Sequence, residues 1–415
     1  MKDGQFFREV EANCWDGATR ATECDHYHVD VQVLSTVPVM FSYWAKPKDT
    51  LEVSKFLNDH IAEVVSLFPK RFIGLGTLPM QSPDLAIKEL ERCKKIGLVG
   101  VEIGSHINDW NLNDENLFPI YEAMQNLDTA AKENNLVFMN EIGLDPGVDH
   151  MSAMKVIDSI RAKGGKMLLF ESFCGGLVAP ESDTNLWNYK FTWNPRNVVL
   201  AGQGGASKFL QEGTYKYIPY HKLFRRTEIL NIDGYGKFEA YANRDSLKYK
   251  SVYGLDSILT LYRGTIRRVG FSRAWNIFVQ LGMTDDSYTI EDSENMSYRD
   301  FTNSFLAYSP SDSVELKLRY YLKIDQDDVI WDKLVELDIF NGSKIVGIKD
   351  ATPAQILQRI LMDSWTLGED DKDMIVMQHL FGYELNGKKH QIESSMVCLG
   401  DNQIYTAMAK TVGLP

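Results

Sequence analysis

Short apolar runs alternate with longer amphipathic segments from residue 29 onward, and this alternation limits the folds open to the chain. The apolar runs span 31–37, 72–78, 100–103 and 136–142. Helical periodicity between and around them covers 49–68, 83–96 and 115–135. Strand–helix–strand units at this spacing cross over in a right-handed sense and build a parallel sheet. We therefore predict a parallel α/β arrangement for the first third of the chain.

The rhythm changes after residue 144, where a helix over 148–163 is followed by an irregular stretch over 175–205, rich in Gly, Asn, Trp and Pro. Further strands are predicted near 240 and over 167–174, 258–263, 374–381 and 391–399. Further helices are predicted over 206–212, 270–281, 314–322, 328–338, 353–366 and 402–412. The polar, acidic segment 283–312 is typical of a surface connection. This mixture predicts two domains, 1–143 and 144–415, of which the second is α+β.

Composition narrows the function classes. Hydrophobic residues make up 44% and charged residues 24% of the 415 residues, as in soluble globular proteins. The formal net charge of −13 argues against nucleic-acid partners and anionic membranes. The five cysteines are odd in number and lack a Cys-x-x-Cys pair, which argues against a disulfide framework or zinc knuckle. With no signal-peptide pattern at the N-terminus, we predict a cytoplasmic protein.

Two short motifs carry acid or metal-binding groups. His26 and His28 have the spacing of a metal-binding pair, but they precede the run 31–37, whereas barrel ligands gather where strands end. We interpret them as surface histidines and predict no metal site. Asp145 and Asp149 follow the run 136–142, where a parallel sheet binds its ligands. From these residues alone we favour a simple turn followed by a helix cap at Asp149.

Two arginine motifs suit carboxylate ligands. Arg244 lies in Asn-Arg-Asp-Ser, and Arg263 begins Arg-Gly-Thr-Ile-Arg-Arg. A guanidinium beside small residues forms bidentate pairs with carboxylates, although surface charge pairing is the commoner use of such arginines. No Gly-x-Gly-x-x-Gly follows a strand, and the sequence contains no P-loop and no Gly-x-Ser-x-Gly.

Residues 2–125 resemble the 2-amino-3-carboxymuconate-6-semialdehyde decarboxylase family of the amidohydrolase superfamily. The resemblance is carried by residues 2–8, 11–16, 34–47, 72–81 and 117–119. It implies a metal-dependent carboxy-lyase with a TIM-barrel fold, and it matches Arg8 to an arginine that helps to bind the substrate carboxylate. The family's opening His-x-His strand and its later metal ligands have no counterpart here, so zinc is not expected.

Residues 127–415 resemble the L-glutamate-forming saccharopine dehydrogenases. The resemblance is carried by residues 139–151, 173–181, 189–193, 243–246, 263–265, 372–374 and 407–415. It implies NADP as cofactor and a small amino-acid substrate, saccharopine or glutamate. Leu144 and Asp145 are matched to the meeting point of cofactor and substrate, and Trp193 to the cofactor side. The substrate carboxylates are matched to Arg244, Gly264, Thr265 and Ile266.

Together the two resemblances imply a partial TIM-barrel-like parallel βα segment followed by an α+β saccharopine-dehydrogenase-like domain, joined near 125–127. The chain departs from the saccharopine pattern at Val178, where proline is usual, and at Arg268, where an aromatic is common. The nucleotide-binding half of that family is not matched. We therefore expect NADP binding and oxidoreductase activity to be impaired, with Asp145 as the nearest candidate for a catalytic base. The alternatives are a decarboxylase or a non-catalytic fusion. An unclosed barrel leaves exposed strand edges and apolar surface, which promote a homodimer or aggregation.

Overall fold

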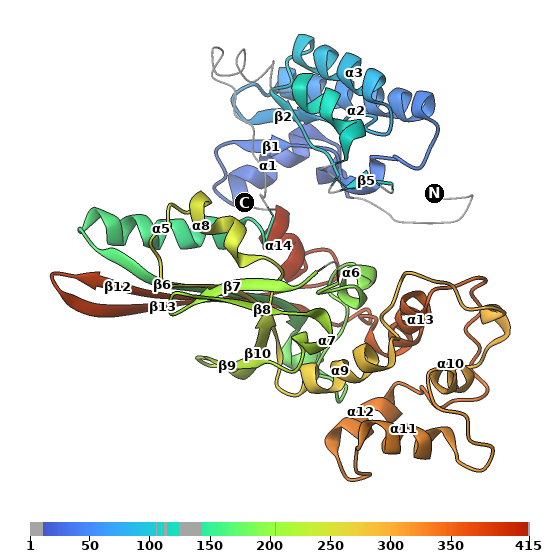
Figure 1. Ribbon diagram of the computed structural model, residues 1–415. Helices are drawn as coiled ribbons and strands as arrows, with labels where there is room; N and C mark the ends of the chain where they lie inside the picture. Colours follow the sequence, from blue (N-terminus) through green and yellow to red (C-terminus); the bar gives the residue numbers. More distant parts are fainter. Residues whose placement is uncertain are drawn as a thin grey trace. The chain divides into compact units, whose positions relative to one another are not determined.

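The computed structural model describes residues 11–104, 106–108, 110–111, 114–123, 143–203 and 205–413. The chain divides into two compact units, residues 1–140 and 141–415 (Figure 1). Each unit has a hydrophobic core of its own. Within the described residues, no helix has the length and apolar character needed to cross a membrane.

The first unit is built on a three-stranded parallel sheet. Its strands are β1 (Gln32–Leu34), β2 (Phe72–Gly76) and β3 (Gly100–Val101), in the order β1-β2-β3. Helices α1 (Gly17–His26), α2 (Pro47–Leu67) and α3 (Pro83–Lys95) precede or connect these strands, and a small hairpin pairs β4 (His106–Ile107) with β5 (Trp110–Asn111). The predicted alternation of strands and helices is therefore present in this part of the chain. The predicted strand over 136–142 lies outside the described residues.

Local sequence signals explain these helices. In α2 the buried residues Thr50, Ser54, Asn58, Ile61 and Val64 recur every three or four positions, which places them on one face. Ser82 precedes α3, Pro83 is its first residue, and Gly97 follows its end with a φ of 92°, so the predicted helix over 83–96 is confirmed.

The two histidines of the possible metal motif are both exposed. His26 is the last residue of α1, and His28 lies just after it in a turn. They are therefore surface histidines, as the sequence indicated.

The second unit contains an eight-stranded mixed sheet. Its strands are β6 (Lys166–Val178), β7 (Ser207–Gln211), β8 (Thr214–Ile218), β9 (Thr227–Ile232), β10 (Gly236–Ala242), β11 (Thr260–Arg268), β12 (Asp373–Leu385) and β13 (Lys388–Leu399). The main order is β13-β12-β6-β11-β10-β9, and β7 and β8 attach to β11. The central strand β6 runs parallel to β11 and antiparallel to β12.

The helices of this unit are α5 (Val148–Ala162), α6 (Pro195–Val199), α7 (Tyr220–Leu223), α8 (Tyr249–Val252), α9 (Phe271–Leu281), α10 (Tyr298–Ser304), α11 (Val314–Leu322), α12 (Val329–Glu336), α13 (Pro353–Trp365) and α14 (Ala407–Gly413). Figure 1 shows α5 and α8 over one face of this sheet, whereas α10, α11, α12 and α13 lie beyond one end of it. Residues of α5 and α8 form one core cluster with Phe170 and Leu261. A larger cluster, which contains Trp187, Trp275 and Trp365, packs on the other face.

Two of the segments predicted for this unit are wrong. The predicted helix over 206–212 is strand β7, which pairs with β8 along its whole length and with β11. The segment 283–312 is more than a surface connection, because it contains α10, whose Tyr298 and Phe301 side chains are 1% and 0% exposed. β7 pairs with β8, only two residues further along the chain, and with the distant β11.

Candidate functional site

The centre of the candidate site is one guanidinium held by two carboxylates. Arg263, on β11, donates from Nη2 to Asp149 Oδ2 at 2.6 Å and also to Asp145 Oδ1. Asp149 lies in the first turn of α5, and its Oδ1 accepts a hydrogen bond from the backbone N–H of Gly147 at 2.7 Å. The N-cap of α5 is Gly147, so the predicted cap at Asp149 is wrong. Asp149 ties the turn before α5 to the sheet.

Burial governs the electrostatics of this group. The side chains of Arg263 and Asp149 are 7% and 1% exposed, and the ring of Tyr249 lies 4.2 Å from the guanidinium carbon. Burial raises the pKa of Asp145 to about 6, Arg263 opposes the rise, and Asp149 adds to it. Two ionised carboxylates around one guanidinium carry a net charge of −1. Asp145 is therefore a carboxylate that can accept a proton near neutral pH.

Aromatic residues enclose the group on the side of α8. His150 Nδ1 and Tyr253 Oη form a hydrogen bond, and the His150 ring lies 4.9 Å from that of Tyr249. The nearby pair Ser152 Oγ and His379 Nε2 is 2.7 Å apart, and burial lowers the pKa of His379 to about 4. Sequence reasoning missed Tyr249 and Tyr253, because no local pattern connects them to Arg263.

The residues matched to cofactor and substrate are distributed around this centre. Leu144 is 7% exposed and packs against Cys174, Ile375 and Met377. Gly264 is buried, and a Cβ there would lie 2.7 Å from the Phe173 ring, which explains the glycine. Ile266 is fully buried in the large core cluster and Thr265 is half-buried. Gly264, Thr265 and Ile266 belong to β11, and Leu144 packs against residues of β6 and β12.

Arg244 lies two residues after the end of β10 and is exposed. Its carbonyl oxygen accepts a hydrogen bond from the Lys208 N–H at 2.8 Å, and the N–H of Asn243 donates to the Arg263 carbonyl at 2.8 Å. The backbone of Arg244 is therefore fixed close to that of Arg263. Trp193, just before α6, is 43% exposed. Arg8 lies outside the described residues.

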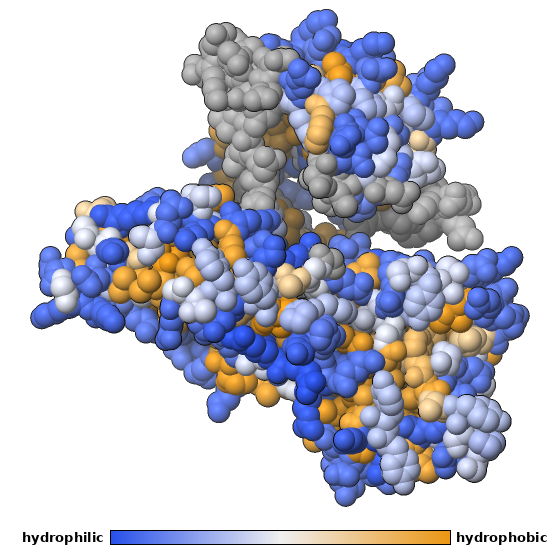
Figure 2. Space-filling view, in the orientation of Figure 1, coloured by the Kyte–Doolittle hydropathy of each residue, from blue (hydrophilic) through white to orange (hydrophobic). Residues whose placement is uncertain are grey.

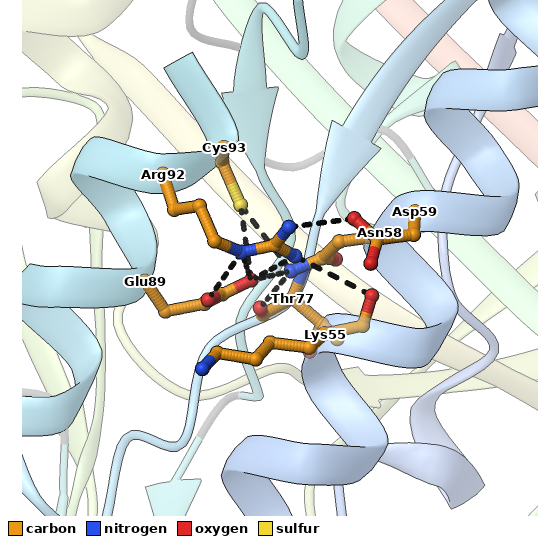
Figure 3. A network of polar contacts seen from close by, with 7 residues as sticks. All are labelled: Lys55, Asn58, Asp59, Thr77, Glu89, Arg92 and Cys93. Carbon is orange, nitrogen blue, oxygen red and sulfur yellow. Dashed lines mark hydrogen bonds and ion pairs between the residues drawn. The ribbon is translucent and has the colours of Figure 1, made fainter. Parts of the chain in front are cut away.

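The first unit has a buried polar network of its own (Figure 3). Asn58 of α2 donates from Nδ2 to the Thr77 carbonyl at 3.0 Å, to Glu89 Oε1 at 2.8 Å and to Cys93 Sγ at 3.2 Å. Its Oδ1 accepts from the Thr77 N–H at 2.7 Å. Arg92 then bridges Glu89, at 2.8 Å, and Asp59, at 2.6 Å.

This network joins α2, α3 and the end of β2, and its one cysteine is not in a reactive state. Burial, followed by the charge of Glu89, raises the pKa of Cys93 to about 12, so its thiol stays protonated. Among the described residues, no three or more His, Cys, Asp or Glu side chains are grouped so that they hold a metal ion. The network is structural.

Comparison with known proteins finds a family match for each unit. Residues 143–415 match the family model of the saccharopine dehydrogenase C-terminal domain, and residues 4–132 match that of the amidohydrolases. A saccharopine dehydrogenase (NADP(+), L-glutamate-forming) of Saccharomyces cerevisiae is 32% identical over 305 residues, which cover 71% of this chain and 67% of that protein. A 2-amino-3-carboxymuconate-6-semialdehyde decarboxylase of Dictyostelium discoideum is 57% identical over 131 residues, 31% of this chain and 36% of that protein.

A solved structure supports the larger match. The apo histidine-tagged saccharopine dehydrogenase (L-Glu forming) from Saccharomyces cerevisiae aligns with a TM-score of 0.62 and 25% identity, over 85% of this chain and 81% of that one. The chain spans about two thirds of the yeast relative and about one third of the decarboxylase. The chain thus belongs to the saccharopine dehydrogenase family through residues 143–415, and its residues 4–132 are similar to the amidohydrolases.

Proposed function

We propose that the second unit binds an amino-acid substrate of the saccharopine or glutamate type, and that its oxidoreductase turnover is impaired or absent. The observation that carries the proposal is the exposed Arg244 guanidinium, whose backbone is fixed beside that of Arg263. Arg263 itself is engaged by Asp145 and Asp149. Arg244 is therefore the arginine that remains open to a ligand.

The charges at this site suit a zwitterion. A substrate carboxylate pairs with Arg244, because arginine forms strong charge-assisted hydrogen bonds with carboxylates. The group of Asp145, Asp149 and Arg263 carries a net charge of −1 and attracts an ammonium group. Asp145, whose pKa is raised to about 6, is our candidate for the residue that takes up a proton from a bound amine. Gly264, Thr265 and Ile266 support the site through the strand they share with Arg263.

The residues described do not fit the pyrophosphate of a dinucleotide. Such a phosphate needs a free helix N-terminus after a strand, and the sequence has no Gly-x-Gly-x-x-Gly. The first turn of α5 already contains the Asp149 carboxylate, which accepts from the Gly147 N–H at 2.7 Å and would repel a phosphate. Leu144 is buried, and the exposed Trp193 offers only a flat ring surface. We therefore propose weak NADP binding and derive no hydride-transfer step.

Titration of the full chain with glutamate and with saccharopine tests the proposal. We expect a dissociation constant no tighter than about 1 mM, equivalent to about 4 kcal/mol. Arg244→Ala should remove this binding, because it deletes the charge-assisted pair. Arg8→Ala is the matched control and should leave binding unchanged. If Arg8→Ala abolishes glutamate binding and Arg244→Ala does not, the site lies in the amidohydrolase segment and the proposal is wrong.

The 57% identity of 131 residues to a decarboxylase supports a second candidate, a carboxy-lyase activity of the first unit. For this unit we propose a partial TIM-barrel-like segment without catalytic zinc, since its His26 and His28 are surface residues in and after α1. Metal analysis before and after zinc loading separates the two candidates. One equivalent of tightly held zinc that is lost in His26→Ala would favour the carboxy-lyase.

A further inference from the structure

A cavity of about 490 Å³ lies in the second unit, and it shares no residue with the site around Arg263. It is bounded by α9, by the start of β9 and the middle of β10, and by α11 and α12 with the loop between them. Its volume is within the range of small-molecule sites. Phe224, Ile277, Leu322, Ile324 and Ile330 give it an apolar wall. Figure 2 shows hydrophobic surface among the helices of this part of the unit, within a mostly hydrophilic face.

Cationic side chains line the same cavity. Arg225, Arg273 and Lys323 contribute three positive charges. Arg273 pairs with Asp328 at 2.7 Å, whereas Arg225 and Lys323 are exposed and have no ion-pair partner in the part of the chain that the structure describes. In a chain with a formal net charge of −13, a cavity with two free cations is selective for an anion.

The one acidic residue of the lining offsets only one of these charges. Glu239 accepts hydrogen bonds from the Gly270 N–H at 2.9 Å and the Ser272 N–H at 2.5 Å, at the start of α9. The helix N-terminus therefore stabilises its negative charge. With Asp328 counted against Arg273 and Glu239 against one further cation, the cavity keeps a net charge of +1.

A buried amide in the lining is left without a partner. Asn276 is 6% exposed, and its Oδ1 has no hydrogen-bond partner among the described residues. Buried acceptors in folded proteins generally have a hydrogen-bond partner. Asn276 lines the cavity, and a half turn of its amide presents either the acceptor or the donor end to a ligand.

We propose that this cavity binds a small organic carboxylate that has an apolar body and a hydrogen-bond donor. Arg225 and Lys323 meet the carboxylate, the isoleucines and Phe224 contact the apolar body, and Asn276 accepts from the donor. The proposal is independent of the function proposed for the site around Arg263.

Calorimetric titration of the full chain tests each feature of this ligand class. The probes are 2-hydroxyoctanoate, octanoate without the donor, octanamide without the charge, and inorganic phosphate without the apolar body. We expect saturable binding of 2-hydroxyoctanoate at one site, with octanoate weaker and octanamide weaker still. Arg225→Gln should weaken binding of 2-hydroxyoctanoate about fivefold, the upper end of the effect of an exposed ion pair. Asn276→Ala should remove the difference between 2-hydroxyoctanoate and octanoate.

Arg226→Gln is the matched control, because Arg226 is the next residue but does not line the cavity. Its guanidinium donates to Gln211 Oε1 at 3.1 Å and lies over the Phe209 ring. This variant should bind the probes as the wild type does. The proposal is overturned if Arg225→Gln and Arg226→Gln lose the same amount of binding, or if octanamide binds as well as octanoate. It is also overturned if phosphate binds as tightly as 2-hydroxyoctanoate, or if no probe binds at about 10 mM.

Discussion

Arg263 and Asp149 are 114 residues apart in the sequence and form an ion pair of 2.6 Å in which both side chains are buried. The pair ties the first turn of α5 to the middle of the sheet. A buried ion pair of this kind contributes little net stability by itself, but removal of one partner leaves an uncompensated charge. Here two carboxylates depend on one guanidinium, since Asp145 contacts the same atom.

Replacement of Arg263 by leucine should therefore destabilise the protein strongly. We expect Arg263→Leu to lower the free energy of unfolding by about 3–5 kcal/mol, because it leaves Asp145 and Asp149 buried without a cation. Urea unfolding at pH 7 measures this loss. The control is Arg244→Ala, which removes an exposed arginine and should change the free energy by no more than about 0.5 kcal/mol. Equal effects of the two variants would mean that the buried carboxylates are satisfied in another way.

The partnership of Arg263 also shows where sequence reasoning stops. The sequence analysis predicted that Asp145 and Asp149 follow a strand, and it identified both arginine motifs. It could not predict which arginine pairs with these carboxylates across more than a hundred residues. It therefore predicted a cap at Asp149, whereas the carboxylate pairs with Arg263. In contrast, α2 and α3 were predictable because their apolar periodicity, Pro83 and Gly97 are local signals.

The prediction of a helix over 206–212, where the structure has strand β7, was also wrong. Ser207–Gln211 reads Ser-Lys-Phe-Leu-Gln, which has no polar–apolar alternation, and five positions are too few to separate a strand from a helix. Its partners β8 and β11 decide the outcome. For α10 a signal did exist: Ser297 and Asp300 form a capping box, which marks a helix start.

Asn58 offers a test of the polar network in the first unit. Asn58→Ala leaves the Thr77 N–H without its partner and removes one of the donors to Glu89, which keeps Arg92, and we expect the free energy of unfolding to fall by about 1–3 kcal/mol. Hydrogen exchange of the segments 72–76 and 83–95 should become faster. Asp59→Ala is the matched control on the next residue of α2, because Asp59 is 59% exposed and its ion pair with Arg92 contributes less than about 1 kcal/mol. Comparable exchange in both variants would show that the network does not hold these elements.

The stability of the second unit should depend on Glu171. Burial, followed by the charge of Glu228, raises the pKa of Glu171 from 4.5 to about 7. Between pH 4.5 and 7 the folded chain therefore keeps a proton on Glu171 that the unfolded chain has released. The free energy of unfolding consequently falls as the pH rises through this window. Urea unfolding at several pH values should show a smaller fall in Glu171→Gln, which cannot ionise. A wild-type profile with the same slope as that of Glu171→Gln would contradict the prediction. Lys166→Gln, on the same strand but exposed, is the control.

The chain should bind NADPH poorly. The N-terminus of α5 is occupied by the Asp149 carboxylate, and the sequence has no glycine-rich loop that would hold the pyrophosphate. Titration followed by nicotinamide fluorescence should show no saturation up to about 100 µM, which corresponds to less than about 5.5 kcal/mol of binding free energy. The yeast saccharopine dehydrogenase, whose name includes NADP(+), is the positive control under the same conditions. Saturable binding at low micromolar concentration would mean that residues other than these hold the dinucleotide. In that case Trp193→Ala, which removes a side chain that is 43% exposed beside α6, should weaken the binding if the cofactor lies where the family resemblance places it.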